Sequence, residues 1–181
     1  MKKITAMLLA LTVAMGLVAC GNNTQAGGET TTTAAAVENL TGTLEEVITS
    51  INEKHAAVEL PLMSMTLDLS DLDGLTYNTG LTSADKVAEA AISEPMMGQP
   101  YSLVLVRVKD AADAEAVAKE MLEKIDTRKW VCMEADTKTA AYYGDVAMFF
   151  MVSSEFAAQA TTATMLDAFK AVCPGEVTEV Q

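Results

Sequence analysis

The sequence predicts an α+β fold, a two-layer sandwich in which helices pack on an antiparallel sheet. Two observations carry this prediction. After residue 85 the apolar patterns give the order strand, strand, helix, strand, strand, strand, helix. The chain from residue 39 to residue 181 also has the length of one domain with one hydrophobic core, and we find no internal repeat in it.

The domain is expected to open with a helix. Thr43-Leu44-Glu45-Glu46 forms a capping box, and an apolar stripe follows at helical spacing to about Lys54. After Pro61, alternation of apolar and polar residues predicts a half-buried strand. Asp73-Gly74 and Asn78-Thr79-Gly80 then predict turns. The apolar positions of the helix are Leu44, Val47, Ile48 and Ile51, and those of the strand are Met63, Met65, Leu67 and Leu69.

Residues 83–94 leave two interpretations open. Their Ala, Glu and Lys content, with Ser83 as a cap, favours a helix, whereas the turn residues Gly98-Gln99-Pro100 favour a strand paired in a hairpin. Tyr101 to Lys109 is a strand, with valines on one face and leucines on the other. Asp110 then caps a helix with apolar positions at Ala114, Val117, Ala118, Met121, Leu122 and Ile125.

The last third of the chain predicts three strands and a helix. Trp130 to Glu134 is expected to be a short strand, followed by a hairpin with strands at 139–143 and 146–152 around Gly144-Asp145. The run 146–152 is apolar on both faces, so it is either a central strand or part of a contact surface. Ser153 or Ser154 caps a final helix that stops at Pro174-Gly175, and the N-terminal helix is free to cover the sheet's other face. The apolar residues of that final helix are Phe156, Met165, Leu166, Phe169 and Val172.

The first nineteen residues have the order of a secretory signal peptide. Lys2 and Lys3 precede an apolar run that closes on Leu17-Val18-Ala19-Cys20, and the run is shorter than the ~20 residues of a membrane-spanning helix. The segment resembles bacterial lipoprotein signals, and this resemblance implies that Cys20 carries a diacylglycerol after cleavage. Residues 20–38, rich in Gly, Thr and Ala, are expected to be a disordered linker. We therefore expect a domain fixed to the outer face of the bacterial membrane.

The net negative charge of the chain limits the classes of molecule that it is expected to bind. The whole chain has a net charge of −13, and cleavage before Cys20 leaves 10 basic and 25 acidic residues, a net charge of −15. This balance argues against nucleic acid, whose affinity for proteins comes largely from Lys and Arg. It favours a cationic protein or small-molecule partner, although the same acidity also serves to keep an exported protein soluble.

Few residues suggest catalysis or a cofactor. His55 is the single histidine and lies at the end of the first predicted helix, where a contact with helix carbonyls is the simpler interpretation. No Cys or His spacing suits zinc, so no metal or cofactor is expected. Asp68, Asp71 and Asp73 before Gly74 resemble a calcium-binding loop, but two ligand positions of that pattern fall on Leu69 and Gly80.

Two further groups allow alternative interpretations. Cys132 and Cys173 could form a disulfide outside the cell or could both remain buried thiols. Arg128, Lys129 and Trp130 could contact a carboxylate or sugar ligand. They could equally place two cations after a helix C-terminus and a tryptophan in the core.

One segment carries a resemblance to a known family. Glu94-Pro95-Met96-Met97 before Tyr101-Ser102-Leu103-Val104-Leu105-Val106-Arg107-Val108-Lys109-Asp110, in a chain with a lipidation motif and a linker, resembles lipoproteins of Gram-positive gut bacteria. That family is known only as a domain of unknown function. The resemblance spans about residues 40–175, implies the same small α+β fold, favours a strand for Val87 to Ser93, and implies no activity.

These observations leave three classes of function. A non-catalytic binding or interaction module at the cell envelope accounts best for an exported, tethered domain with few catalytic groups. An envelope assembly or structural factor has the same features. A hydrolase that uses dispersed carboxylates is the third class, because folding can bring distant Asp and Glu residues together.

Overall fold

The computed structural model describes residues 38–55 and 59–181; the expected signal peptide, Cys20 and nearly all of the expected linker lie outside this part of the chain. The described residues form one six-stranded sheet in the order β1-β2-β3-β5-β4-β6, and every neighbouring pair is antiparallel. The strands are β1 (Leu62–Thr66), β2 (Val87–Pro95), β3 (Tyr101–Val108), β4 (Thr137–Tyr143), β5 (Val146–Val152) and β6 (Thr178–Val180). The α-helices are α1 (Leu44–Lys54), α2 (Leu72–Thr79), α3 (Ala114–Lys124) and α4 (Thr162–Val172).

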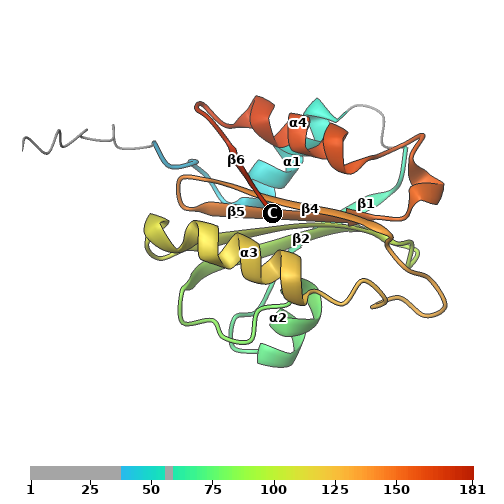
Figure 1. Cartoon of the computed structure of the whole chain (residues 1–181), viewed down its shortest axis with the longest axis horizontal. Helices are drawn as coiled ribbons and strands as arrows, with labels where there is room; N and C mark the ends of the chain where they lie inside the picture. Colours follow the sequence, from blue (N-terminus) through green and yellow to red (C-terminus); the bar gives the residue numbers. More distant parts are fainter. Residues whose placement is uncertain (1–37, 56–58) are drawn as a thin grey trace, which may run out of the picture. The chain divides into compact units, whose positions relative to one another are not determined.

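Helices cover both faces of the sheet (Figure 1). On one face α1 and α4 pack against each other and against Tyr101, Leu103 and Leu105. On the other face α2 and α3 pack with the cluster that contains the β3 valines. The α+β class with helices packed on an antiparallel sheet is thus confirmed, but the helices lie on both faces, so the sheet is the middle of three layers where the sequence predicted two. The final helix joins the N-terminal helix on one face, and α3 covers the opposite face.

The two apolar runs form β3 and β5, the two central strands of the sheet. All seven residues of β5 are buried, and β5 lies between β3 and β4. The sequence interpretation of β5 as a central strand is therefore confirmed. β2 is a strand, and this settles the open choice between helix and strand in favour of hairpin pairing with β3. The capping box of α1 is present as expected, with Thr43 and Glu46 bonding each other's backbone N–H groups.

Helix α2 was not expected, because its two boundary signals were interpreted as turns. Asp71 Oδ1 accepts the backbone N–H of Gly74 at 3.0 Å, which caps the helix. Gly80, with φ +78°, ends it in the left-handed conformation. The Asp-Gly and Asn-Thr-Gly patterns therefore mark the start and the stop of one short helix.

The expected strand at Trp130 to Glu134 is wrong. These residues belong to the loop between α3 and β4, residues 125–136, and β4 begins at Thr137. Side-chain and backbone bonds fold this loop on itself and onto α2: Ala135 N–H bonds Thr127 O, and Tyr77 Oη donates to Lys129 O. These bonds turn the segment back on itself, and residues 130–134 form no strand.

The final helix begins later than expected. Ser153 caps only a short 3-10 turn, Ser154–Phe156, and Thr161 caps α4 itself. Asp110 likewise caps a 3-10 turn, Ala111–Asp113, that leads directly into α3. Within the described part of the chain, no helix is both long and apolar enough to cross a membrane.

Candidate functional site

The sheet has two ends with different chemistry. Along β3, Arg107 pairs with Val146 of β5 at one end, and Tyr101 pairs with Val152 at the other. Six residues of extended strand place these ends about 20 Å apart. We describe them as the Arg107 end and the Tyr101 end.

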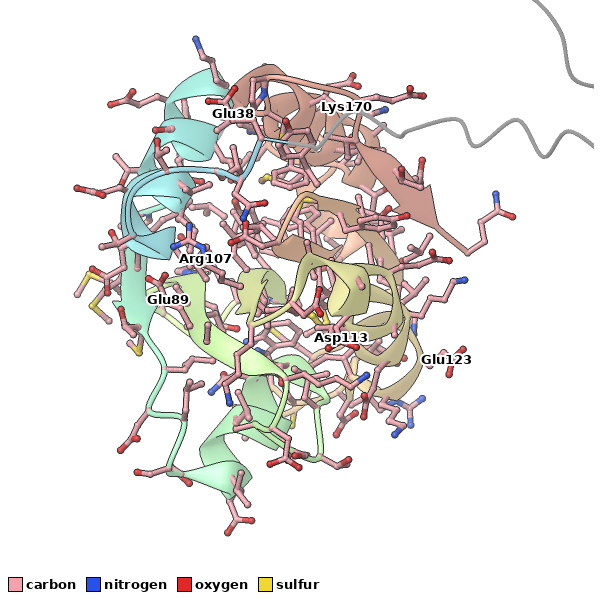
Figure 2. All side chains as sticks on the ribbon, turned by 90° about the vertical axis from the view of Figure 1, so that its left-hand side faces the viewer. Glu38, Glu89, Arg107, Asp113, Glu123 and Lys170 are labelled. Atoms are coloured by element: carbon pink, nitrogen blue, oxygen red, sulfur yellow. The ribbon has the colours of Figure 1, made fainter. Side chains whose placement is uncertain are left out.

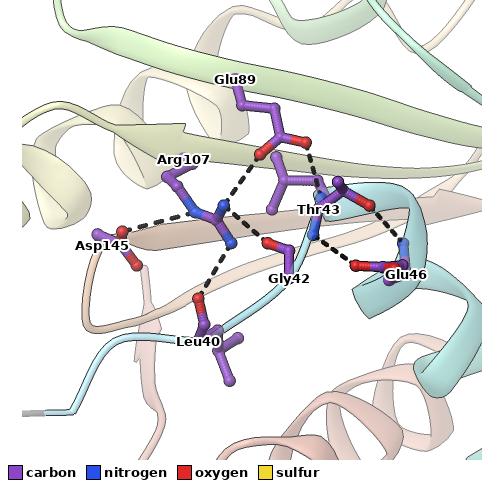
Figure 3. Close-up of polar contacts among 8 residues, drawn as sticks. Leu40, Gly42, Thr43, Glu46, Glu89, Arg107 and Asp145 are labelled. Carbon is purple, nitrogen blue, oxygen red and sulfur yellow. Dashed lines mark hydrogen bonds and ion pairs between the residues drawn. The ribbon is translucent and has the colours of Figure 1, made fainter.

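The Arg107 end holds the incoming chain (Figure 3). Arg107 Nη1 donates to Gly42 O at 2.9 Å and Nη2 donates to Leu40 O at 3.1 Å. The same guanidinium pairs with Glu89 at 3.0 Å and with Asp145 at 3.5 Å. Glu89 in turn accepts the backbone N–H of Leu44, the first residue of α1, at 2.8 Å. This Arg107 clamp fixes where the described chain enters the domain.

The surroundings of the clamp are polar and compact. Figure 2 views the molecule from this side and shows Glu89 and Arg107 next to each other. A Cβ on Gly144, in the β4–β5 turn, would lie 2.9 Å from Asn39 Oδ1, so the incoming chain runs along that turn. The clamp residues are about one-fifth exposed or less, and their hydrogen bonds serve the chain itself. We assign them a structural role.

The Tyr101 end instead exposes apolar side chains. The β2–β3 turn, residues 96–100, and the loop 125–136 lie there, opposite the entry of the described chain (Figure 1). The bond from Met96 N–H to Pro61 O joins the turn to the start of β1, and Met63 of β1 pairs with Glu94 of β2. The large exposed apolar side chains of the described residues all come from β1, α2, this turn and this loop: Met63, Met65, Leu72, Tyr77, Met96, Met97, Val131 and Met133. We call these eight residues the methionine-rich surface.

Lys129 links parts of this surface from within. Its side chain is 1% exposed, and its Nζ lies 2.5 Å from Glu94 Oε1. Nζ also donates to Ser102 Oγ at 3.2 Å and lies 5.2 Å and 5.5 Å from the ring centres of Trp130 and Tyr77. Burial lowers the pKa of Lys129, and the Glu94 carboxylate opposes that shift. The lysine thus ties β2, β3, α2 and the loop together.

The predicted ligand-contact group Arg128, Lys129 and Trp130 is divided by the fold. Lys129 is buried, and Trp130 packs in the core with 8% exposure. Arg128 is exposed and pairs with Glu134 at 3.1 Å. An open hollow of about 300 Å³ lies beside it, lined by Arg128, Trp130, Cys132, Met133 and Glu134. For Lys129 and Trp130, the interpretation as core residues fits the structure better than a ligand contact.

The two cysteines do not form the disulfide that the sequence allowed. Both are free thiols: Cys173 is buried and Cys132 is exposed. Burial raises the pKa of Cys173 to about 12, so its thiol stays protonated and unreactive at neutral pH. The fold separates them because the expected strand that would have placed Cys132 beside Trp130 in the core is an exposed loop.

The remaining polar candidates have structural partners. His55 caps the end of α1, and its Nε2 lies 2.8 Å from Thr164 Oγ1 of α4, while burial lowers its pKa. Asp68 accepts hydrogen bonds from Ser70, and Asp71 caps α2. Among residues 38–55 and 59–181, no three His, Cys, Asp or Glu side chains are placed to hold a metal ion. Asp68 and Asp71 thus have local bonding roles.

Sequence reasoning did not single out the methionine-rich surface. The sequence shows the alternating Met63 and Met65 and the pair Met96-Met97. Their placement in one region of the fold depends on the β1–β2 register and on the fold of the loop, which the sequence does not show. Comparisons with protein-family models, with curated proteins and with solved structures find no match to this chain. The resemblance to the Gram-positive lipoprotein family stays a prediction.

Proposed function

We propose that this chain is a lipid-anchored, extracytoplasmic binding module whose methionine-rich surface contacts a protein partner at the cell envelope. The observation that carries the proposal is that the β2–β3 turn and the loop 125–136, which lie together at the Tyr101 end, expose Met96, Met97, Val131 and Met133. Exposed apolar side chains that are grouped on one part of a domain often mark an interaction site. Methionine suits such a site because its flexible, polarisable side chain adapts to different partners.

The placement of the chain entry supports the same proposal. The Arg107 clamp holds residues 40–42 at the end of the sheet opposite the methionine-rich surface. If Cys20 is acylated, the linker reaches the domain at the Arg107 end. The methionine-rich surface is then not the end of the domain that the linker enters. A negatively charged domain is also repelled by an anionic membrane surface, so it should stand off from the lipid.

Mass spectrometry of the protein purified from its native membrane tests the anchor. We expect a mature chain that begins at Cys20 and carries a diacylglycerol on the thiol. An unmodified Cys20, or a chain that retains residues 1–19, contradicts the anchoring part of the proposal.

Site-specific photo-crosslinking in cells tests the binding surface. A photoreactive amino acid at Met97 or Val131 should give a discrete crosslinked protein, whereas the same group at exposed Glu123 of α3 or Lys170 of α4 should not. Equal crosslinking from all four positions, or none from Met97 and Val131, refutes the surface assignment. Turnover of a cell-wall or sugar substrate by the purified protein would favour the hydrolase instead.

A further inference from the structure

Among residues 38–55 and 59–181, no strand lies beside the outer edge of β1. β1 is the first strand in the sheet order, so only β2 pairs with it. Leu67 N–H bonds Ala90 O, and Met96 N–H bonds Pro61 O, which shows that residues 61 and 67 face β2. Hydrogen-bonding direction alternates along an antiparallel strand. Met63 and Met65 therefore also bond β2, and the N–H and C=O of Ser64 point outward.

Several usual protections of an edge strand are missing within β1. The five residues of β1 include no charged residue and no proline, and their pairing with β2 runs without a bulge. The opposite edge strand, β6, has three residues and carries Glu179. Met63 and Met65 of β1 are 47% and 45% exposed, and Figure 2 shows sulfur atoms projecting beside this strand. A strand edge that no described strand pairs with is a template for an added strand.

Charge defines what would occupy this edge. Thr66, the last residue of β1, donates to the Glu45 carboxylate of α1 at 2.9 Å. α1 packs on β1 and carries three glutamates and one lysine, and Asp68 follows two residues after the strand. The described residues as a whole have 24 acidic and 10 basic side chains, because Lys2, Lys3 and Glu29 precede them. A cationic segment would be attracted to this edge, whereas a second copy of the chain would bring the same negative charge.

We propose that the outer edge of β1 binds an extended, cationic peptide segment of a partner protein as a seventh strand of the sheet. Main-chain bonds to Ser64 would supply register, and Met63 and Met65 would contact alternate apolar side chains of the segment. Lysine or arginine side chains between them would face the carboxylates near β1. This inference rests on the proposed function and names the chemistry of the partner.

A single proline substitution distinguishes strand addition from simple charge attraction. Ser64→Pro removes an outward N–H and leaves the β1–β2 bonds in place, a position where an edge strand tolerates proline. Ser64→Ala keeps the N–H and serves as the matched control. The probes are a peptide of about eight alternating lysine and valine residues and its glutamate–valine counterpart, long enough to cover the five residues of β1. Each is titrated into the acylated protein in detergent, and binding is read by fluorescence anisotropy.

We expect the lysine peptide to bind the wild type and Ser64→Ala equally, and Ser64→Pro at least about tenfold more weakly. The glutamate peptide should not bind. Hydrogen exchange should show that the lysine peptide protects the amides of Ser64 and Thr66. Circular dichroism of Ser64→Pro must match the wild type; if this variant unfolds, the amide protection decides the outcome alone.

Three results overturn the inference: no binding of the lysine peptide, equal binding to Ser64→Pro, or self-association of the protein through β1. The crosslinking experiment at Met97 is independent of these results. A partner captured there while the lysine peptide fails to bind refutes the β1 edge and leaves the proposed binding module standing. Failure of both refutes both.

Discussion

Replacing Arg107 by alanine should destabilise the domain and release the chain at its entry. The substitution leaves Glu89 and Asp145 without their cation, and these carboxylate side chains are only 21% and 14% exposed. Removing one partner of a fully buried ion pair costs about 3–5 kcal/mol. Because these groups keep some contact with water, we expect a loss of about 3 kcal/mol in the free energy of unfolding. For a domain of this size, that lowers the melting temperature by about 10 °C.

The assay combines urea denaturation with hydrogen exchange. Arg107→Ala should unfold at lower urea, and the amides around Leu44 should exchange faster than those of β5, since the two carbonyl bonds to Leu40 and Gly42 are lost. Lys86→Ala is the matched control, because it removes an exposed ion pair to Asp113 and should leave stability unchanged.

Adding Glu89→Gln to Arg107→Ala should recover part of the loss, since the pair variant no longer leaves a carboxylate at Glu89 without a cation. A melting temperature of Arg107→Ala equal to that of the wild type would refute the account of the clamp. So would a loss of stability that leaves exchange at Leu44 unchanged.

Three further predictions concern glycine geometry, pH and amine reactivity. Gly80→Ala should destabilise by about 2–4 kcal/mol, because φ is +78° and a Cβ would lie 2.7 Å from the backbone N of Ile125. Gly98→Ala has a φ of +20° but open space around the new Cβ, so in the same urea titration it should cost only about 1 kcal/mol. Burial lowers the pKa of His55, so the unfolded chain takes up a proton at a higher pH than the folded chain does. The stability of the wild type should therefore fall, relative to that of His55→Gln, as the pH drops below 6.5. If the urea midpoints of the two proteins change in parallel below that pH, the prediction is wrong. Acetylation of the native protein should spare Lys129 until urea unfolds the chain, and early modification detected by mass spectrometry would show that its amine is accessible.

Elements with a strong local pattern could be predicted from the sequence. The capping box of α1, the apolar stripe of α3 and the β4–β5 hairpin each depend on residues within about one element of one another. Helix α2 could not be recognised in this way. It is eight residues long, and Asp-Gly and Asn-Thr-Gly are as typical of turns as of a helix cap and a helix stop.

The contacts that define the two ends of the sheet join distant residues, so sequence spacing did not reveal them. Arg107 binds the carbonyl of Gly42, which is 65 residues away. Lys129 meets Glu94 only because the loop after α3 folds over the end of β2. A ligand contact was one of the two interpretations that the sequence left open for Lys129, and it would suit an exposed lysine. Burial and a carboxylate partner gave it a structural role.

If the domain is anchored as proposed, the arrangement of β3 keeps the entry of the chain apart from the proposed binding surface. Arg107 near one end of this strand holds the incoming chain, and Ser102 near the other end contacts the lysine that organises the methionine-rich surface. The strand is paired on both sides and buried, so it resists bending. Perturbations at sites more than about 10 Å apart usually add independently. Ser64→Pro should therefore lower affinity for the lysine peptide without loosening the amides at Leu44. Faster exchange at Leu44 in this variant would mean that the ends communicate through the sheet, and the division of tasks inferred from their separation would be wrong.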